Sequence, residues 1–187
     1  MLAAALAALF PLALSQAPAA ARTFAVAPGS TVSYRLVHAL HAVEGACGAV
    51  EGRARLLPDG GVQVSVRARV GSFDSGNGNR DAHMREVTEA ARFPFVSLKA
   101  VGRGSASADE GAALDLELDA ELTFHGVARR IAIPVKVRFE SATRATVESS
   151  FPVSLEAHGV ERPSLLFVKV EDRIEIAARL VLEEENG

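Results

Sequence analysis

The chain has 187 residues, a formal net charge of −3 and a pI of about 6.0, and 49% of its residues are hydrophobic. This length is enough for one domain with a hydrophobic core. The charges form no clustered cationic run, so we do not expect a nucleic-acid-binding surface.

The first segment, residues 1–21, has the pattern of a secretory signal peptide. Leu2–Leu14 is an apolar run, and Ala17–Ala21 fits the small-x-small pattern of a cleavage site. The run is shorter than the ~20 residues that a membrane-spanning helix needs. We therefore expect a periplasmic or secreted protein without a transmembrane anchor, whose mature domain covers residues 22–187. The alternative is a disordered, alanine-rich arm.

Strands are predicted wherever apolar and polar residues alternate with a period of two. The first half of the domain contains three such segments, around Val32–Leu36, then Val50–Leu57 and Val62–Val70. Gly45 and Gly48 flank a bend between the first two segments. Pro58–Gly61 has the residues of a turn, and Gly71–Asn79 is expected to be a loop.

Asp81–Ala91 lacks this alternation and is rich in helix-forming residues, so it predicts the one helix of the chain. Asn79 or Asp81 is expected to cap its start. Phe93, which precedes a proline, is expected to end it. A single short helix cannot form a layer, so we expect it to cover one end of the fold.

The second half contains five further alternating segments. They are Phe95–Val101, Ala113–Phe124, Ile131–Phe139, Thr143–Leu155 and Leu166–Leu182. His125-Gly126 is expected to be a tight turn, and Gly102–Gly111 a polar loop. Pro134 and Pro152 cannot donate a ladder hydrogen bond, so a bulge or an edge is expected at each. Asp172 interrupts the apolar set of the last segment and indicates a bend or a break.

Long strands with one apolar face must bury that face. The pattern therefore predicts an all-β fold, an extended antiparallel barrel of about eight strands with one short α-helix. Such a barrel can be filled by its own side chains or can enclose an apolar guest. The phenylalanines of the strands suit both outcomes.

No sequence signature of catalysis or of nucleotide binding is present, so we expect no catalytic residue and no cofactor. His38, His41, His83 and Cys47 raise the question of a metal site. His38 and His41 are three positions apart, however, and such residues point to opposite faces of a strand. We therefore expect no metal, and we interpret Cys47, the only cysteine, as a small packed residue.

Asn79-Arg80-Asp81 with His83 is the densest polar cluster of the chain. In one interpretation it lies at the mouth of the barrel, where Arg80 pairs with an anionic head group. In the interpretation we favour, Asp81 caps the helix and Arg80 pins the helix to the barrel rim through a salt bridge.

Two groups of motifs resemble the YceI-like family. Asn79–Met84 followed by Arg92–Val96 is similar to its RD-x-H-L … F-P pattern, and Leu122–Val127 followed by Ile131–Val135 is similar to its L-T-x-x-G-V-T-x-P-V segment. Tyr34 to His38 corresponds to the family's first strand and histidine. The resemblance covers about Phe24 to Glu183.

This resemblance implies a lipocalin-like barrel that binds a polyisoprenoid or another long-chain amphiphile, often in the periplasm. We accordingly expect a non-enzymatic carrier whose partner is a long-chain isoprenoid or fatty lipid, and we leave homodimer formation open. The expected wall residues are Tyr34, Leu36, Phe95, Leu98, Phe124 and Phe151, and the expected head-group contacts are Arg80 and His83.

Two other functions are kept as alternatives. One is an enzyme acting on a lipid or quinone, with His38, His83 and Asp81 as acid–base groups. The other is a stress-related interaction protein whose barrel is solid and holds no ligand.

Overall fold

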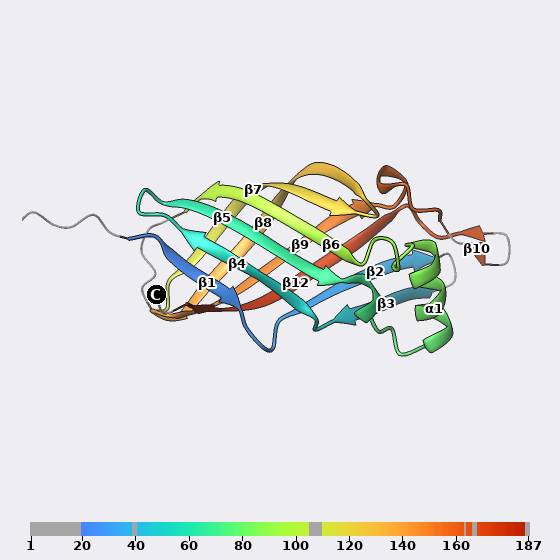
Figure 1. The fold of residues 1–187 in the computed structure, drawn as a ribbon, viewed down its shortest axis with the longest axis horizontal. Coiled ribbons are helices and arrows are strands. Elements are labelled where there is room, and N and C mark those ends of the chain that lie inside the picture. Colours follow the sequence, from blue (N-terminus) through green and yellow to red (C-terminus); the bar gives the residue numbers. More distant parts are fainter. Residues whose placement is uncertain (1–19, 39–40, 105–109, 163, 166–167, 186–187) are drawn as a thin grey trace, which may run out of the picture.

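Alternating strands make up most of the molecule, as the computed structural model in Figure 1 shows. The structure describes residues 20–38, 41–104, 110–162, 164–165 and 168–185, so nearly all of the expected signal peptide lies outside the described residues. The helices are α1 (Gly78–Val87) and the short 3-10 helices η1 (Val70–Ser72) and η2 (Glu156–His158). The strands are β1 (Arg22–Val26), β2 (Thr31–His38), β3 (His41–Cys47), β4 (Val50–Leu56), β5 (Gly61–Arg69), β6 (Phe95–Arg103), β7 (Ala113–Phe124), β8 (Val127–Ser141), β9 (Arg144–Ser154), β10 (Ser164–Leu165), β11 (Val168–Lys169) and β12 (Arg173–Glu184).

The strands close into an antiparallel barrel. Its eight members follow the order β1, β4, β5, β6, β7, β8, β9 and β12, and β12 pairs with β1 to complete the circle. The β2–β3 pair is attached to β12 beside this circle, and α1 lies at the same end of the barrel (Figure 1). The predicted fold class is therefore confirmed.

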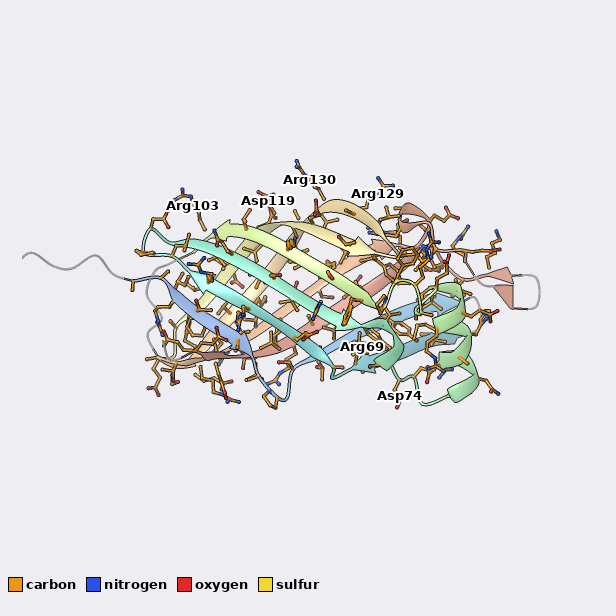
Figure 2. The ribbon with its side chains drawn as sticks, viewed as in Figure 1. Arg69, Asp74, Arg103, Asp119, Arg129 and Arg130 are labelled. Carbon is orange, nitrogen blue, oxygen red and sulfur yellow. The ribbon has the colours of Figure 1, made fainter. Side chains whose placement is uncertain are left out.

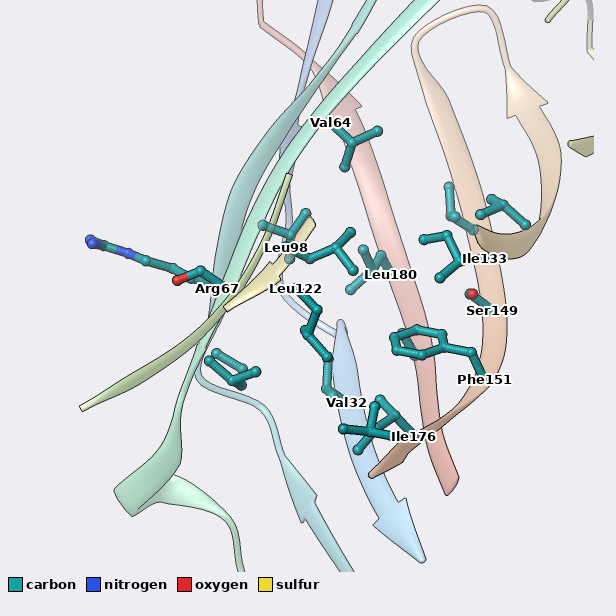
Figure 3. Close-up of a pocket in the computed structure, with 18 of the residues that line it drawn as sticks. Val32, Val64, Arg67, Leu98, Leu122, Ile133, Ser149, Phe151, Ile176 and Leu180 are labelled. Carbon is teal, nitrogen blue, oxygen red and sulfur yellow. The ribbon is translucent and has the colours of Figure 1, made fainter. Parts of the chain in front are cut away.

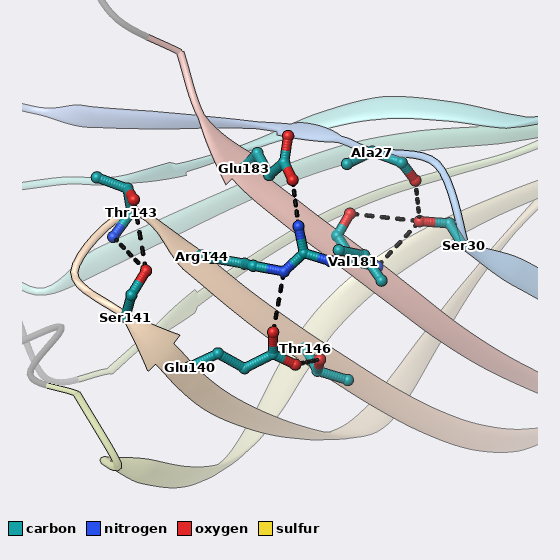
Figure 4. A network of polar contacts seen from close by, with 9 residues as sticks. All are labelled: Ala27, Ser30, Glu140, Ser141, Thr143, Arg144, Thr146, Val181 and Glu183. Atoms are coloured by element: carbon teal, nitrogen blue, oxygen red, sulfur yellow. Dashed lines mark hydrogen bonds and ion pairs between the residues drawn. The ribbon is translucent and has the colours of Figure 1, made fainter.

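One strand, β12, serves both parts of this arrangement. Its first half, Glu175–Arg179, pairs with β2, and its end, Leu182–Glu184, pairs with β1. The bend between β1 and β2 is held by Ser30, whose hydroxyl donates to the carbonyl of Ala27 at 2.7 Å and accepts from the amide of Val181 at 2.9 Å (Figure 4). The buried hydroxyl of Ser30 thus has hydrogen-bond partners at the point where β12 changes its pairing from β2 to β1.

Charged residues tie together the end of the barrel opposite α1. Arg144 pairs with Glu140 at 2.9 Å and also with Glu183, so one guanidinium links β9 with β8 and β12 (Figure 4). Arg22 of β1 binds both carboxylate oxygens of Glu184 at 2.7 Å. This second contact is a bidentate pair across the junction that closes the barrel.

The two faces of the wall are sharply divided. In β7, Leu118, Ala120 and Leu122 are buried, whereas the alternating acidic residues are exposed. The charged side chains labelled in Figure 2, among them Arg103, Asp119 and Arg130, point away from the barrel. The period of two has therefore placed the apolar face inside.

Two strands of the large sheet were not predicted. β1 is short, and β3 occupies the region where the glycines indicated a bend. The inner face of β3 consists of Val43, Gly45 and Cys47. Small residues give a weak alternation signal, and Gly45 is needed because a Cβ there would lie 2.6 Å from the Tyr34 ring.

The helix is shifted from its predicted position: it begins three residues earlier and ends four residues earlier. Asn77 caps it by accepting the amide of Arg80 at 3.1 Å, so the assignment of the cap to Asn79 or Asp81 is wrong. Glu89, with φ of 44°, ends the helical path before Phe93 is reached. A turn residue, and not the proline, therefore stops the helix.

The expected breaks are found. His125 and Gly126 both have positive φ, 50° and 75°, as a two-residue hairpin turn requires. β12 begins only after Asp172, which confirms the break there, although residues 166–167 of the predicted strand lie outside the described residues. Pro134 and Pro152 both lie where β8 and β9 are not paired with each other, so each is at a strand edge. Residues 105–109 of the predicted polar loop are also outside the described part.

Candidate ligand cavity

The barrel is hollow. It encloses a cavity of about 340 Å³, which falls within the roughly 300–1,000 Å³ of typical ligand pockets and far exceeds the ~30 Å³ of one water molecule. Its lining is almost entirely apolar and comes from all the barrel strands, from β2 and β3 and from α1. Figure 3 shows part of this lining. A cavity with such an apolar lining suits an apolar guest better than water.

Five of the six predicted wall residues line this cavity: Tyr34, Leu36, Leu98, Phe124 and Phe151. They come from four different strands, so the fold brings together residues that lie far apart in the sequence. Leu98 and Phe151 are labelled in Figure 3, on opposite walls.

The sixth residue, Phe95, lies outside the cavity. Its ring is covered by the guanidinium groups of Arg67 and Arg69, 4.4 and 4.9 Å from the ring centre. In β6, Val96 and Leu98 face inward, so Phe95 belongs to the outer face. Arg67 likewise points away from the cavity in Figure 3.

The two predicted head-group residues are both on α1 and both border the cavity. Arg80 is held in place, because its Nε donates to the hydroxyl of Ser75 at 2.8 Å and its Nη2 donates to the Ser75 carbonyl at 2.6 Å. His83 has an exposed side chain, whose Nδ1 lies 3.5 Å from Glu86. Arg80 is thus the better ordered of the two head-group candidates.

Asp81 is buried at 6% exposure and does not cap the helix. It accepts the amide of Ser75 at 3.1 Å and the Ser75 hydroxyl at 2.5 Å. The expected salt bridge between Arg80 and the barrel rim is not formed among the residues that the structure describes. Instead, Ser75 joins Arg80 and Asp81, so these residues hold the loop before α1 against the helix.

The phenol of Tyr34 lies in the field of this cluster. Burial raises the pKa of Tyr34 above its ordinary value of 10.0, the charge of Asp81 raises it further, and the charge of Arg80 lowers it. The Tyr34 ring also packs on Phe73, with 5.7 Å between the ring centres. The hydroxyl therefore remains protonated at neutral pH and adds no charge to the cavity.

Many wall residues were not predicted individually. Val64, Leu118, Ile133 and Ile176 line the cavity from the strands, and Met84 and Val87 line it from α1. The sequence contained the information needed to find them, because every second residue of a strand points to the same side, so the inward residues of one strand lie two positions apart. Knowing for one residue of each strand whether it points into the barrel would have been enough to assign the others.

The residues considered for a metal do not form a site in the described part of the chain, where no group of three His, Cys, Asp or Glu could hold an ion. The side chains of His38 and His41 lie outside the described residues. Cys47 is buried at 1% exposure, against Ala68 and Phe73. None of the described helices is both long enough and apolar enough to span a membrane.

Comparison with known proteins supports the motif resemblance. A family model described as the YceI-like domain matches residues 25–182. Among solved structures, a polyisoprenoid-binding domain from Saccharophagus degradans is similar at 16% identity and a TM-score of 0.74, over 87% of this chain and 98% of that one. BcnA from Burkholderia cenocepacia is similar at 19% identity and a TM-score of 0.70, over 83% and 98%. No curated protein matches the chain.

Proposed function

Because the chain belongs to the YceI-like domain family, we propose that it is a carrier that holds a long-chain isoprenoid or another long apolar lipid inside its barrel. The observation that supports this most directly is the apolar cavity inside the closed barrel. One structural neighbour is described as a polyisoprenoid-binding domain, which favours the same class of ligand.

Binding of such a chain would be driven by removing its apolar surface from water. Each methylene or methyl group transferred into the cavity contributes about 0.8 kcal/mol. The walls offer few polar partners, so recognition would rest on shape and desolvation, with polar contacts confined to one end of the ligand.

We place that polar end beside α1. Arg80 of α1 borders the cavity and is held by two hydrogen bonds to Ser75. The tail would then run along the barrel towards Phe24 and Phe139, which line the cavity far from the helix. An ordered guanidinium can donate to a carbonyl, hydroxyl or phosphate oxygen.

We further propose that residues 1–21 direct export and are removed, so that the carrier acts in the periplasm or outside the cell. The alternating wall begins at Arg22, directly after the proposed cleavage region. Export fits the composition of this segment. Sequencing the N terminus of protein recovered from the host would test the boundary.

The carrier function is tested by native mass spectrometry of the protein extracted from its own host without detergent. We expect one lipid mass for each chain and, after extraction, an isoprenoid pattern in accurate-mass analysis. Protein that carries no apolar adduct, and that also fails to bind added geranylgeraniol, would contradict the proposal. A change in the mass of the bound lipid during incubation would instead support an enzyme.

A further inference from the structure

Several ladders of the barrel wall are shorter than their strands, and among the described strands the longest stretch over which two neighbours run side by side unpaired lies between β8 and β9. These strands pair only from Lys136 to Ser141 and from Arg144 to Glu148, although β8 begins nine residues earlier and β9 continues to Ser154. On their other sides both strands are paired along this whole stretch, β8 with β7 and β9 with β12. We call the unpaired stretch, residues 130–135 with 149–154, the β8–β9 seam.

Two prolines explain why the ladder stops. The Pro134 carbonyl accepts the Ser149 hydroxyl at 2.7 Å, so the main-chain polar groups of Pro134 face β9. The main-chain polar groups of successive residues in a strand point alternately to its two neighbours. The amide of Leu155 donates to the carbonyl of Asp172 on the β12 side, so the polar groups of Pro152, three positions earlier, face β8. The next two hydrogen-bonded pairs of the ladder, 134 with 150 and 132 with 152, would each lack one N–H.

Side chains close the seam from inside. Ile133 of β8 and Phe151 of β9 are 3% and 7% exposed, although no ladder joins their strands at this height. Both line the cavity, and with Ser149 they lie along one wall in Figure 3. At the far end, Arg129 donates to the carbonyl of Ala157 at 2.9 Å and closes the gap.

Opening a fully paired part of the wall breaks a series of hydrogen bonds between backbone groups. Parting the seam breaks only the two hydrogen bonds that the side chains of Ser149 and Arg129 donate across it. At the helix end the tail would have to pass Met84 and Val87 of α1, which line the cavity there. Resting on the carrier function proposed above, we infer that the apolar tail enters and leaves the cavity sideways, through the β8–β9 seam. Pro134 and Pro152 keep this seam unpaired.

The inference is tested by locking the seam. In a Cys47→Ala parent, Pro134→Cys with Ser150→Cys places two exposed cysteines opposite each other, two positions beyond the last ladder pair, Lys136 with Glu148. The matched control joins the same Ser150→Cys to Ala177→Cys, its partner in the intact β9–β12 ladder. Uptake and release of cis-parinaric acid, a fluorescent polyunsaturated chain, are followed by stopped flow in the oxidised and reduced proteins.

We expect the locked seam to slow uptake and release by about tenfold or more, with a similar equilibrium affinity, while the control disulfide changes neither. A second variant, Pro134→Val with Pro152→Val, restores both N–H groups and is expected to slow exchange in the same direction. Equal rates in the oxidised and reduced seam variant would overturn the seam as the route. A parent that binds neither this probe nor geranylgeraniol would overturn the carrier function itself.

Discussion

Tyr34 is the only tyrosine, and the chain has no tryptophan, so the absorbance of one cavity residue can be followed alone. Its hydroxyl lies near the Asp81 carboxylate and the Arg80 guanidinium, which shift its pKa in opposite directions. The ring also covers Gly45 so closely that no larger residue fits there. A single chromophore therefore reports on the wall and on the polar cluster together.

We expect Tyr34 to titrate above its ordinary pKa in an ultraviolet absorbance titration of the native protein. Asp81→Asn should lower this pKa, because a negative charge that opposes the phenolate is removed. Arg80→Gln should raise it, because a favourable positive charge is lost. Circular dichroism at each pH shows whether the barrel is still folded, and two variants that shift the pKa in the same direction would contradict the arrangement.

The prediction of wall residues from sequence was limited because it did not establish which alternating set of residues in each strand points into the barrel. Phe95 and Leu98 were both expected in the wall, yet they are three positions apart in one uninterrupted strand and so face opposite sides. Hydrophobicity favoured Phe95, while its position beneath Arg67 and Arg69 depends on neighbours in β5 that only the register defines. A one-sided strand predicts which residues share a face, but an aromatic residue can be covered outside the barrel.

At the scale of elements, the strength of the alternation determined how well each boundary was predicted. β7 has the predicted limits, Ala113–Phe124, because every second residue is a large apolar residue or alanine and the others are mostly charged. β3 was missed because Gly45 and Cys47 carry little hydrophobic signal. The helix was displaced because several polar residues could have capped it, and only the loop geometry selects Asn77.

The turn between β7 and β8 offers a test of how a local conformation supports the barrel. Gly126 has φ of 75°, and a Cβ there would lie 2.5 Å from Cε1 of Phe93. Gly126→Ala should therefore destabilise the protein by about 2 kcal/mol or more, from left-handed backbone strain and displacement of the ring. Urea unfolding measures the change in free energy.

The control for this turn is Gly111→Ala. Gly111 has a similar φ of 80°, but among the residues that the structure describes no atom lies within 4 Å of the place that an alanine methyl group would take there. Only the backbone strain of about 1 kcal/mol is therefore expected. The difference between the two variants isolates the contact with Phe93. If both variants lost the same free energy of unfolding, the Phe93 ring would have moved aside without any cost in stability.

For the whole molecule, closure depends on the short β1–β12 ladder. The Arg22 guanidinium holds the pKa of Glu184 below its ordinary value. A carboxyl with a lowered folded-state pKa stabilises the fold above its unfolded pKa of about 4.3, and this contribution is lost as the pH falls through the folded-state value. Acid should therefore weaken the closure of the barrel.

We expect Glu184→Gln to reduce stability at pH 7 by up to about 1 kcal/mol, since the pair is partly exposed to water. The difference from the parent should shrink between about pH 5 and pH 3, where the parent carboxylate becomes protonated. Thermal unfolding across this range measures it. Glu51→Gln, which removes an exposed partner of Arg67 away from the junction, is the control. A difference that grows as the pH falls would contradict the assignment.

Whether the hollow interior is the binding site can be decided by filling it. Val64 points into the cavity from β5 (Figure 3), and its neighbour Gln63 is exposed on the outer face. Val64→Trp places an indole where the ligand chain would lie, and should weaken binding of cis-parinaric acid by about 100-fold. Because an indole there occupies empty space, stability should be kept or increased.

The matched control Gln63→Trp adds the same ring to the same strand on the opposite face, and should bind the probe like the parent. Fluorescence titration gives the affinities, and thermal unfolding gives the stabilities. If Val64→Trp remained folded and bound the probe as tightly as Gln63→Trp, the ligand would have to occupy another surface. The cavity would then be a packing feature, and the carrier function would lose the observation that supports it most.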